Sequence, residues 1–323
     1  MAITKFADMV VVPEHFTTYV NERTTEKSAL VQSGVAVPDA RVAQVINSTP
    51  KGGNMITMPF YKPLSGDDEI FGEDALTPDG VQTGSERATL LIRQKAWGTT
   101  DLARVKGGSD PMAAIMNMVS DWWLEREQAI FISVLKGLFG ASGALATNHM
   151  LDISTQSGAA AVIGVDATLD AKDLMGDAYK KITAIAMHSA TFTKLQKQQK
   201  IETVYSSDLK VDIDTYLGYR VIVDDSMPVN SGVYDTYLIG AGAFTRDSGT
   251  PDGLISTETD RDKLKAEDFL INRKAFVLHP NGVSFKGVPT KAYATNQDLE
   301  TASNWELVKG AKNVPIVCLR HKI

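Results

Sequence analysis

The chain has 323 residues, 43% of them hydrophobic and 22% charged, which is the composition of a folded protein with one large domain or two ordinary ones. Its 33 Lys and Arg residues against 39 Asp and Glu residues give a net charge of −6, which excludes the basic surface of a tight nucleic-acid binder. A single cysteine excludes an internal disulfide framework, and the lack of a signal-peptide pattern or of a run of about 20 apolar residues predicts a protein made in the cytoplasm without a membrane span.

Residues 1–34 are mixed in character and only moderately apolar. A terminal segment of this kind is poorly ordered unless another surface holds it, so we expect it to depend on a neighbouring chain. The pair Pro38–Asp39 then predicts the start of a short helix.

Two extended runs follow and predict a long β-hairpin. In residues 54–61 the apolar side chains of Ile56, Met58 and Phe60 alternate with the positions between them. Residues 88–97, which include Leu91 and Arg93, are the expected return strand. The connection between the two runs is too long for a tight turn, so it is either a solvated loop or a functional extension. It is acidic from its start, at Asp67, Asp68 and Glu69.

The strongest helix signal begins at Pro111 and continues to about Phe139. Proline suits the first position of a helix, and the apolar residues that follow recur at helical spacing. The adjacent Trp122 and Trp123 could form a ligand box, but packing in the core or at an interface is favoured because each ring offers a large apolar area.

From residue 166 onward, helices and strands interleave, which predicts an α+β or mixed α/β class. We expect strands at 182–187, 215–223 with a break at Gly218, and 234–241, and a helix that Ser189 caps. The pair Asn281–Gly282 predicts the turn of a hairpin between strands 274–278 and 283–286. A last strand is expected at 313–320.

The sequence lacks the residue patterns of enzymes and metal sites. Its five His residues are scattered, and one cysteine cannot build a zinc site. Residues 240–245 begin like a dinucleotide fingerprint but lack its third glycine. Glu258, Asp260 and Asp262 lie on one face of an expected strand, with Arg261 on the other. A metal site there is conceivable, but a solvated or interfacial charge row is favoured. We therefore predict no catalytic residue, no cofactor and no metal.

Five segments, taken in order and with their spacing, resemble a known family. They are residues 185–195 (IAMHSATFTKL), 217–228 (LGYRVIVDDSMP), 240–244 (GAGAF), 258–262 (ETDRD) and 276–282 (FVLHPNG). Each alone is a strand end, a turn or a helix start. As a set they resemble the major capsid proteins of tailed bacteriophages, whose subunits share the fold of phage Hong Kong 97.

The resemblance implies an α+β capsid fold in five regions. They are an N-terminal arm with the first segment of the peripheral domain (P-domain) at 1–50, an extended loop (E-loop) at 51–98, the P-domain with its long spine helix at 99–165, the axial domain (A-domain) at 166–270, and a return to the P-domain at 271–323. This return implies that the last strand lies near the long helix.

The function implied by the resemblance is assembly. Pentamers and hexamers of the chain would form the icosahedral head shell of the virion around phage double-stranded DNA, without sequence-specific binding. A portal protein and a separate scaffolding protein are expected as partners, the latter because the chain starts close to the arm. The alternatives are an encapsulin-like nanocompartment shell and, from another class, a cytoplasmic hydrolase with an unrecognised site.

We expect contacts between subunits on the E-loop, on the spine helix and on the charge row. The candidate interface residues are Ile56, Met58, Phe60, Asp67, Asp68, Glu69, Leu91, Arg93, Trp122, Trp123, Glu258 and Arg261. Some members of the family crosslink a Lys of the E-loop to an Asn of a neighbour. Lys51, Lys62 and Asn281 are conceivable partners for that reaction, but noncovalent contacts are favoured.

Overall fold

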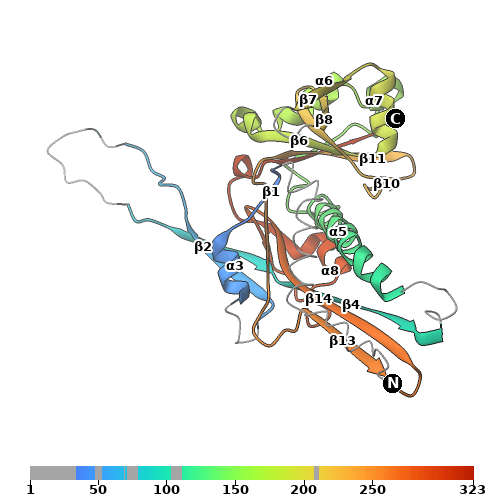
Figure 1. Cartoon of the computed structure of the whole chain (residues 1–323). Helices are drawn as coiled ribbons and strands as arrows, with labels where there is room; N and C mark the ends of the chain where they lie inside the picture. The colour runs from blue at the N-terminus through green and yellow to red at the C-terminus, as the bar shows by residue number, and fades with distance from the viewer. Residues whose placement is uncertain (1–33, 48–52, 69, 71–78, 103–110, 207–210) are drawn as a thin grey trace.

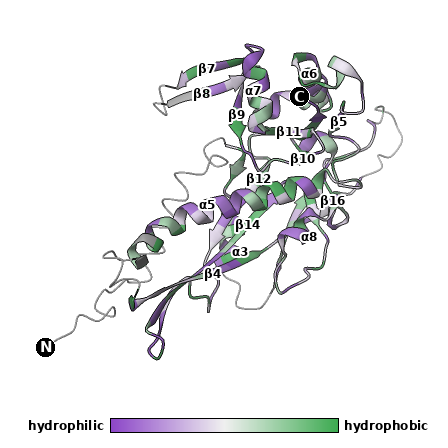
Figure 2. Cartoon of the chain, turned by 90° about the vertical axis from the view of Figure 1, so that its right-hand side faces the viewer, coloured by the Kyte–Doolittle hydropathy of each residue, from purple (hydrophilic) through white to green (hydrophobic). Residues whose placement is uncertain are grey.

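The computed structural model describes residues 34–47, 53–68, 70, 79–102, 111–206 and 211–323. Two larger β-sheets lie on either side of one long helix, α5 (Pro111–Leu138), and a two-stranded ribbon projects away from them (Figure 1). Figure 2, which views the molecule from its side, again shows α5 between strands β11 and β14 of the two sheets. One apolar cluster joins side chains of α5 to both sheets, so the helix and the sheets share a core.

Helix α5 confirms the strongest signal of the sequence. Its 28 residues span about 42 Å at 1.5 Å per residue. From Ile130 to Leu135 every side chain is buried, because the sheets pack against the helix from opposite sides. Between Ile130 and Leu135 the helix is therefore buried around its whole circumference rather than along one stripe.

The larger sheet has eight strands and carries helices α6 (Val165–Asp173) and α7 (Ser189–Lys197). Its strands, in spatial order, are β5 (Met150–Asp152), β17 (Ile316–His321), β11 (Val233–Gly240), β6 (Ile182–Met187), β9 (Tyr219–Val223), β8 (Val211–Tyr216) and β7 (Ile201–Ser206), with β10 (Val229–Asn230) paired to β11. The predicted strand 182–187 is confirmed. The predicted helix after it is present, but it begins at Ser189 and its cap is His188, one residue before the predicted cap; His188 Nδ1 accepts a hydrogen bond from the Ala190 amide at 3.0 Å.

The predicted break of strand 215–223 at Gly218 is confirmed, and the two parts belong to two strands joined by a tight turn. Leu217 and Gly218 have φ values of 53° and 81°, so the chain reverses there and β8 pairs with β9. Two consecutive residues with positive φ are typical of the turns that match the twist of a hairpin.

The second sheet is organised by the 14-residue strand β14 (Glu267–Pro280). On one edge β14 pairs with β12 (Phe244–Gly249) and β13 (Thr257–Asp262), and on the other with β4 (Leu91–Thr100). The two-residue strand β1 (Ala36–Val37) adds to β12 in parallel, and helix α3 (Ala40–Asn47) follows it. The expected helix start after Pro38–Asp39 is confirmed.

The predicted hairpin around Asn281–Gly282 is wrong. One edge of β14 pairs with β12 up to Pro280 and the other with β4 up to Phe276, and β15 (Val283–Phe285) pairs with neither edge. Strand β15 pairs instead with β16 (Trp305–Leu307), after the short helix α8 (Asn296–Glu300). The Asn–Gly turn thus directs the chain to a different partner strand.

The ribbon consists of β2 (Met55–Tyr61) and β3 (Thr83–Thr89), paired from Met55–Thr89 to Tyr61–Thr83. A hairpin beginning at this first strand was predicted, but the predicted return strand 88–97 is wrong. The return strand lies earlier in the chain, and most of 88–97 belongs to β4 in the body of the subunit. In Figure 1 the ribbon extends to the left, clear of both sheets.

The last strand, β17, lies in the eight-stranded sheet and is buried on both faces. Ile316 and Cys318 belong to the cluster that contains the α5 side chains, whereas Val317 and Leu319 point into a second cluster on the side of α6. The strand is therefore near the long helix on one face, as predicted.

Within the described residues, no helix is long and apolar enough to cross a membrane.

Candidate subunit interface and the polar junction at its base

The β2–β3 ribbon and its connection expose large apolar side chains that the subunit does not cover. Tyr61, Leu64, Ile70 and Val81 are 77%, 81%, 93% and 60% exposed. A two-stranded ribbon is marginally stable in water by itself, and clustered exposed apolar side chains are typical of contact surfaces. The ribbon is therefore the strongest candidate for a surface completed by another chain.

The root of the ribbon is fixed in the subunit. The predicted interface residue Ile56 is 6% exposed and belongs to a cluster with Val42 and Ile46 of α3 and with Leu90. Met58, two residues farther out, is half-buried against the same cluster. The ribbon thus changes from core to exposed surface along its length.

Phe60 marks the point at which the ribbon leaves the body. Its ring lies over Gly84 of β3, where a Cβ atom would be 2.6 Å from the ring. The Lys309 Nζ lies 5.2 Å from the centre of the same ring. Beyond this point Asp67 and Asp68 are exposed, and the predicted residue Glu69 lies outside the described residues.

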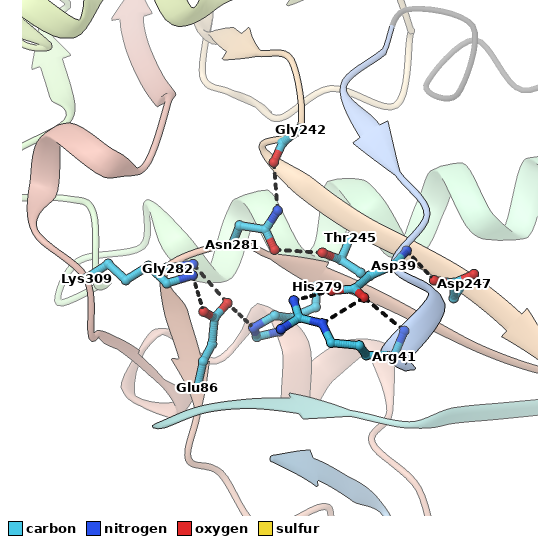
Figure 3. Close-up of polar contacts among 10 residues, drawn as sticks. All are labelled: Asp39, Arg41, Glu86, Gly242, Thr245, Asp247, His279, Asn281, Gly282 and Lys309. Carbon is cyan, nitrogen blue, oxygen red and sulfur yellow. Dashed lines mark hydrogen bonds and ion pairs between the residues drawn. The ribbon is translucent and has the colours of Figure 1, made fainter. Parts of the chain in front are cut away.

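A buried polar junction holds the return strand at the same level (Figure 3). Glu86 of β3 is 3% exposed, and its Oε1 accepts hydrogen bonds from the Gly282 amide at 2.9 Å and from His279 Nε2 at 3.1 Å. The Lys309 Nζ lies 2.6 Å from Glu86 Oε2. Burial raises the pKa of Glu86, but the hydrogen bonds and charges of His279 and Lys309 and the Gly282 amide outweigh burial and lower the pKa to about 2.

The junction continues from the turn after β14 to strand β12. Asn281 Oδ1 accepts a hydrogen bond from Thr245 Oγ1 at 2.7 Å, and its Nδ2 donates to the Gly242 carbonyl at 2.7 Å. Nearby, Asp247 Oδ2 accepts a hydrogen bond from the Asp39 amide at the start of α3. The turn after β14 thereby links the root of the ribbon to the sheet that contains β12 and β14. Asn281, a conceivable crosslinking residue, already has both polar atoms of its side-chain amide in hydrogen bonds.

The predicted interface residues of β4 make contacts inside the subunit. Leu91 is completely buried in the shared core. Arg93 is half-buried, and its Nη2 donates to Asn296 Oδ1 of α8 at 3.0 Å. Their role between subunits stays a prediction.

The tryptophan pair also packs within the subunit. Trp123 is 1% exposed, and its Nε1 donates to Asn272 Oδ1 of β14 at 2.5 Å. Trp122 is half-buried and meets Trp123 and Trp97 edge-on, with ring centroids 4.8 and 5.3 Å away. The sequence favours packing over a ligand box for this tryptophan pair, and in the structure both rings pack against neighbouring side chains.

The charge row on β13 finds partners on adjacent strands. The Arg261 guanidinium lies 2.6 Å from Asp101 Oδ2 and 2.7 Å from Asp268 Oδ1, whereas Glu258 pairs with Arg273 at 3.0 Å. Among the described residues there is no group of three or more His, Cys, Asp or Glu side chains that could hold a metal ion.

Sequence reasoning missed Glu86, His279 and Lys309 as a group. Glu86 belongs to an acidic stretch that is typical of a solvated loop, and its partners lie about 200 positions later in the chain. The hint in the sequence is Gly282, because a glycine can mark a backbone position that no side chain fits. In the structure its φ is +91° and a Cβ atom would lie 2.6 Å from Val314, so the backbone is tightly placed there.

A second buried ionic group was also missed. Glu127 of α5 lies 2.5 Å from Lys274 Nζ of β14 and 2.9 Å from Arg246 Nη2 of β12. Burial raises the pKa of Glu127, but the charges of Lys274 and Arg246 outweigh burial and lower it, which keeps the carboxylate charged. This group fixes the long helix to the sheet that carries the ribbon.

Comparison with known proteins adds two matches of sequence. The sequence profile described as "Gp13-like: Major capsid protein 13-like" matches residues 127–315. The major capsid protein of Bacillus phage SPP1 is 38% identical over 331 residues, covering 100% of this chain and 99% of the relative.

Solved structures are similar in fold at low sequence identity. The capsid of Ralstonia phage GP4 has a TM-score of 0.55 at 9% identity, covering 92% of this chain and 90% of the other. A chain of Mycobacterium phage Che8 has a TM-score of 0.52 at 12% identity, with 88% and 89% covered. The encapsulin SrpI of Synechococcus elongatus PCC 7942 has a TM-score of 0.50 at 13% identity, with 88% and 90% covered. The predicted fold, α+β and like that of phage Hong Kong 97, is confirmed.

Proposed function

The chain belongs to the Gp13-like family of major capsid proteins, and from this premise we propose how it builds a shell. It is a bacteriophage major capsid protein, a structural component of the virion head, so the predicted resemblance is confirmed. The proposal concerns the contacts, the partners and the contents of that shell.

We propose that each subunit places its β2–β3 ribbon across a neighbouring copy, and that pentamers and hexamers so formed close into an icosahedral shell. The observation that carries this proposal is the exposure of Leu64 and Ile70, at 81% and 93%, beyond a root that is firmly buried. A rigid root with an uncovered apolar extension supplies surface that a second copy can bury. Met58, Phe60, Asp67 and Asp68 are the proposed contacts, together with the charge row and the half-buried Trp122.

The five regions 1–50, 51–98, 99–165, 166–270 and 271–323 stay the proposed division into arm, E-loop, P-domain, A-domain and return to the P-domain. The position of α5 between two sheets supports a spine role for this helix. The eight-stranded sheet with α6 and α7 is the proposed capsomer centre, and the last strand joins that sheet.

We propose that the shell is made in the host cytoplasm and encloses phage double-stranded DNA without sequence-specific binding. A net charge of −6 supports a container that does not adhere to its polyanionic content. A portal protein and a separate scaffolding protein are proposed as further partners.

A non-enzymatic role is the better proposal, because the chain belongs to a structural family. An encapsulin-like compartment is the weaker alternative, because the match to an encapsulin is one of fold at 13% identity.

The test is electron microscopy of the purified protein, expressed alone and with a candidate scaffolding protein. Closed shells are expected, with nuclease-protected DNA in particles taken from infected cells. A protein that stays monomeric at all concentrations and with the scaffold would contradict the assembly proposal. Shells that hold protein cargo and no DNA would favour the encapsulin-like alternative.

A further inference from the structure

Glu86 ties one strand of the ribbon to three separate parts of the subunit. Its carboxylate contacts His279 of β14, the amide of Gly282 in the following turn, and Lys309 in the segment after β16. The Arg87 amide beside it donates to Ser284 Oγ of β15 at 3.0 Å. Strand β3 is therefore held to the subunit by side-chain contacts, because among the described residues β2 is the strand that pairs with it.

Lys309 acts on both strands of the ribbon. Its Nζ lies 2.6 Å from Glu86 on β3 and 5.2 Å from the centre of the Phe60 ring on β2. The Lys309 side chain is 32% exposed, whereas Glu86 is 3% exposed. Lys309 can consequently exchange its buried contact for water at small cost, which Glu86 cannot.

Among the described groups around the junction, Lys309 is the one placed to release Glu86. His279 is 1% exposed, so its hydrogen bond to Glu86 is held inside the subunit and its ring cannot exchange that contact for water. Arg41 of α3 acts on Glu86 from a distance, but its guanidinium is bound to Asp39 at 2.7 Å. Asp247 of β12 accepts the Asp39 amide.

We infer that Glu86 and Lys309 form a latch that fixes the direction in which the ribbon leaves the subunit, and that opening this latch frees the ribbon to rotate about its root. This inference rests on the proposed function, because the direction of the ribbon matters where it lies across a neighbour. The seven residues of β2 span about 24 Å, so a small rotation at the root becomes a large displacement at the tip. A latched ribbon is preorganised for binding, and an open one can adapt to a different neighbour position.

The latch is testable in the unassembled full-length subunit, kept dilute. Spin labels on Leu64→Cys and Val288→Cys report the distance from the ribbon to the body, because both positions are more than 80% exposed whereas the native Cys318 is fully buried. Double electron–electron resonance then gives the distribution of that distance. With the native latch we expect one narrow distribution.

Lys309→Met keeps the apolar stem and removes the charge, so it opens the latch without a large change in packing. We expect the distance distribution to widen roughly twofold, and amide exchange in residues 83–89 to accelerate about tenfold or more. Lys312→Met is the matched control: Lys312 pairs with Asp177 at 2.8 Å, both side chains are exposed, and neither belongs to the ribbon root. The control should leave both measurements unchanged.

Glu86→Gln should give the same widening as Lys309→Met, and Lys309→Met alone decides the matter if Glu86→Gln does not fold. Equal distributions in the Lys309→Met and Lys312→Met variants would overturn the latch. Because these measurements use single subunits, they are independent of shell formation. A parent protein that forms no shells would contradict the proposed function and leave the result on the latch standing.

Discussion

A buried carboxylate with three partners makes Glu86 sensitive to pH in a defined direction. Its pKa in the folded protein is about 2, below the ordinary value of 4.5. The contribution of Glu86 to the free energy of unfolding is therefore fully present above pH 4.5 and is lost as the pH falls toward 2. At 1.36 kcal/mol per pKa unit, this contribution is about 3 kcal/mol.

We expect Glu86→Gln to lower the free energy of unfolding by about 3 kcal/mol at pH 7, and the gap to the parent protein to shrink below pH 4.5. Urea unfolding of unassembled subunits at a series of pH values measures this gap. Glu306→Gln is the control, because Glu306 is 61% exposed and lies 3.9 Å from Lys286. A gap that stays constant down to pH 3 would contradict the assignment.

Gly137 marks a close approach of α5 to α8 and to Trp305 at the start of β16. A Cβ atom at this position would lie 2.0 Å from the Leu299 carbonyl oxygen and 2.6 Å from Trp305 Nε1. Because that carbonyl also accepts the Trp305 hydrogen bond at 2.8 Å, the neighbouring backbone cannot move without breaking the bond.

Gly137→Ala is therefore expected to destabilise the subunit by about 1–3 kcal/mol or more, as overpacking does. Thermal unfolding should show a lower midpoint for this variant. Gly80→Ala is the control, because Gly80 has open space around its Cβ position and lies outside every helix and strand. Equal midpoints for the two variants would show that the contact yields easily.

At the scale of elements, the long helix is joined to the sheet by a buried ionic group. Glu127 is flanked by two cations, Lys274 and Arg246, whose side chains are 8% and 15% exposed. Removing the single anion leaves buried positive charge without compensation, which typically costs about 3–5 kcal/mol.

We expect Glu127→Leu to destabilise the subunit by about this amount, and the double change Glu127→Leu with Lys274→Met to recover a large part of the loss. The recovery is expected because Lys274 lies against the rings of Trp123 and Phe276, at 5.9 Å from each centre, where a Met side chain fits. A double-mutant cycle by urea unfolding measures the coupling. Simple additivity of the two changes would contradict it.

Local patterns in the sequence predicted elements well and pairings poorly. Pro111 and the apolar spacing after it located α5, and a run of apolar residues located strand 182–187. The partner of a strand depends on which edges are occupied, and β14 receives partners from positions 91–100, 244–249 and 257–262. No local signal contains that information, so the hairpin at Asn281–Gly282 was predicted between the wrong strands.

The same contrast between what local sequence shows and what it does not applies to the candidate interface. Composition predicted the acidic residues Asp67 and Asp68, which are exposed, but alternation selected the residues of the root and not the exposed Leu64 and Ile70. The side chains that hold the root of the ribbon could not be predicted as buried, because Ile56 and Leu91 have the same residue types as an interface and differ from it only by burial. Glu86 was hidden for the converse reason, since a charged residue in an acidic stretch is normally solvated.

At the scale of the whole molecule, the subunit combines a firmly packed body with an extension whose apolar side chains it leaves uncovered. The body contains two sheets, α5 and the buried ionic groups, whereas the ribbon carries exposed apolar side chains beyond its root. Substitutions in the body and at the root of the ribbon should therefore change the stability of the subunit, and substitutions beyond the root should change its assembly.

Changing the exposed apolar residues Leu64 and Val81 to Ser tests this separation. The free energy of unfolding of the unassembled subunit should change by no more than about 0.5 kcal/mol, because these side chains are 81% and 60% exposed. The yield of closed shells, measured by light scattering and electron microscopy, should fall strongly, because the apolar area that a neighbour would bury is lost. Leu64→Ile keeps the apolar area and should assemble like the parent protein. Normal shell yield in the Ser variant would show that the ribbon tip does not carry the contact between subunits.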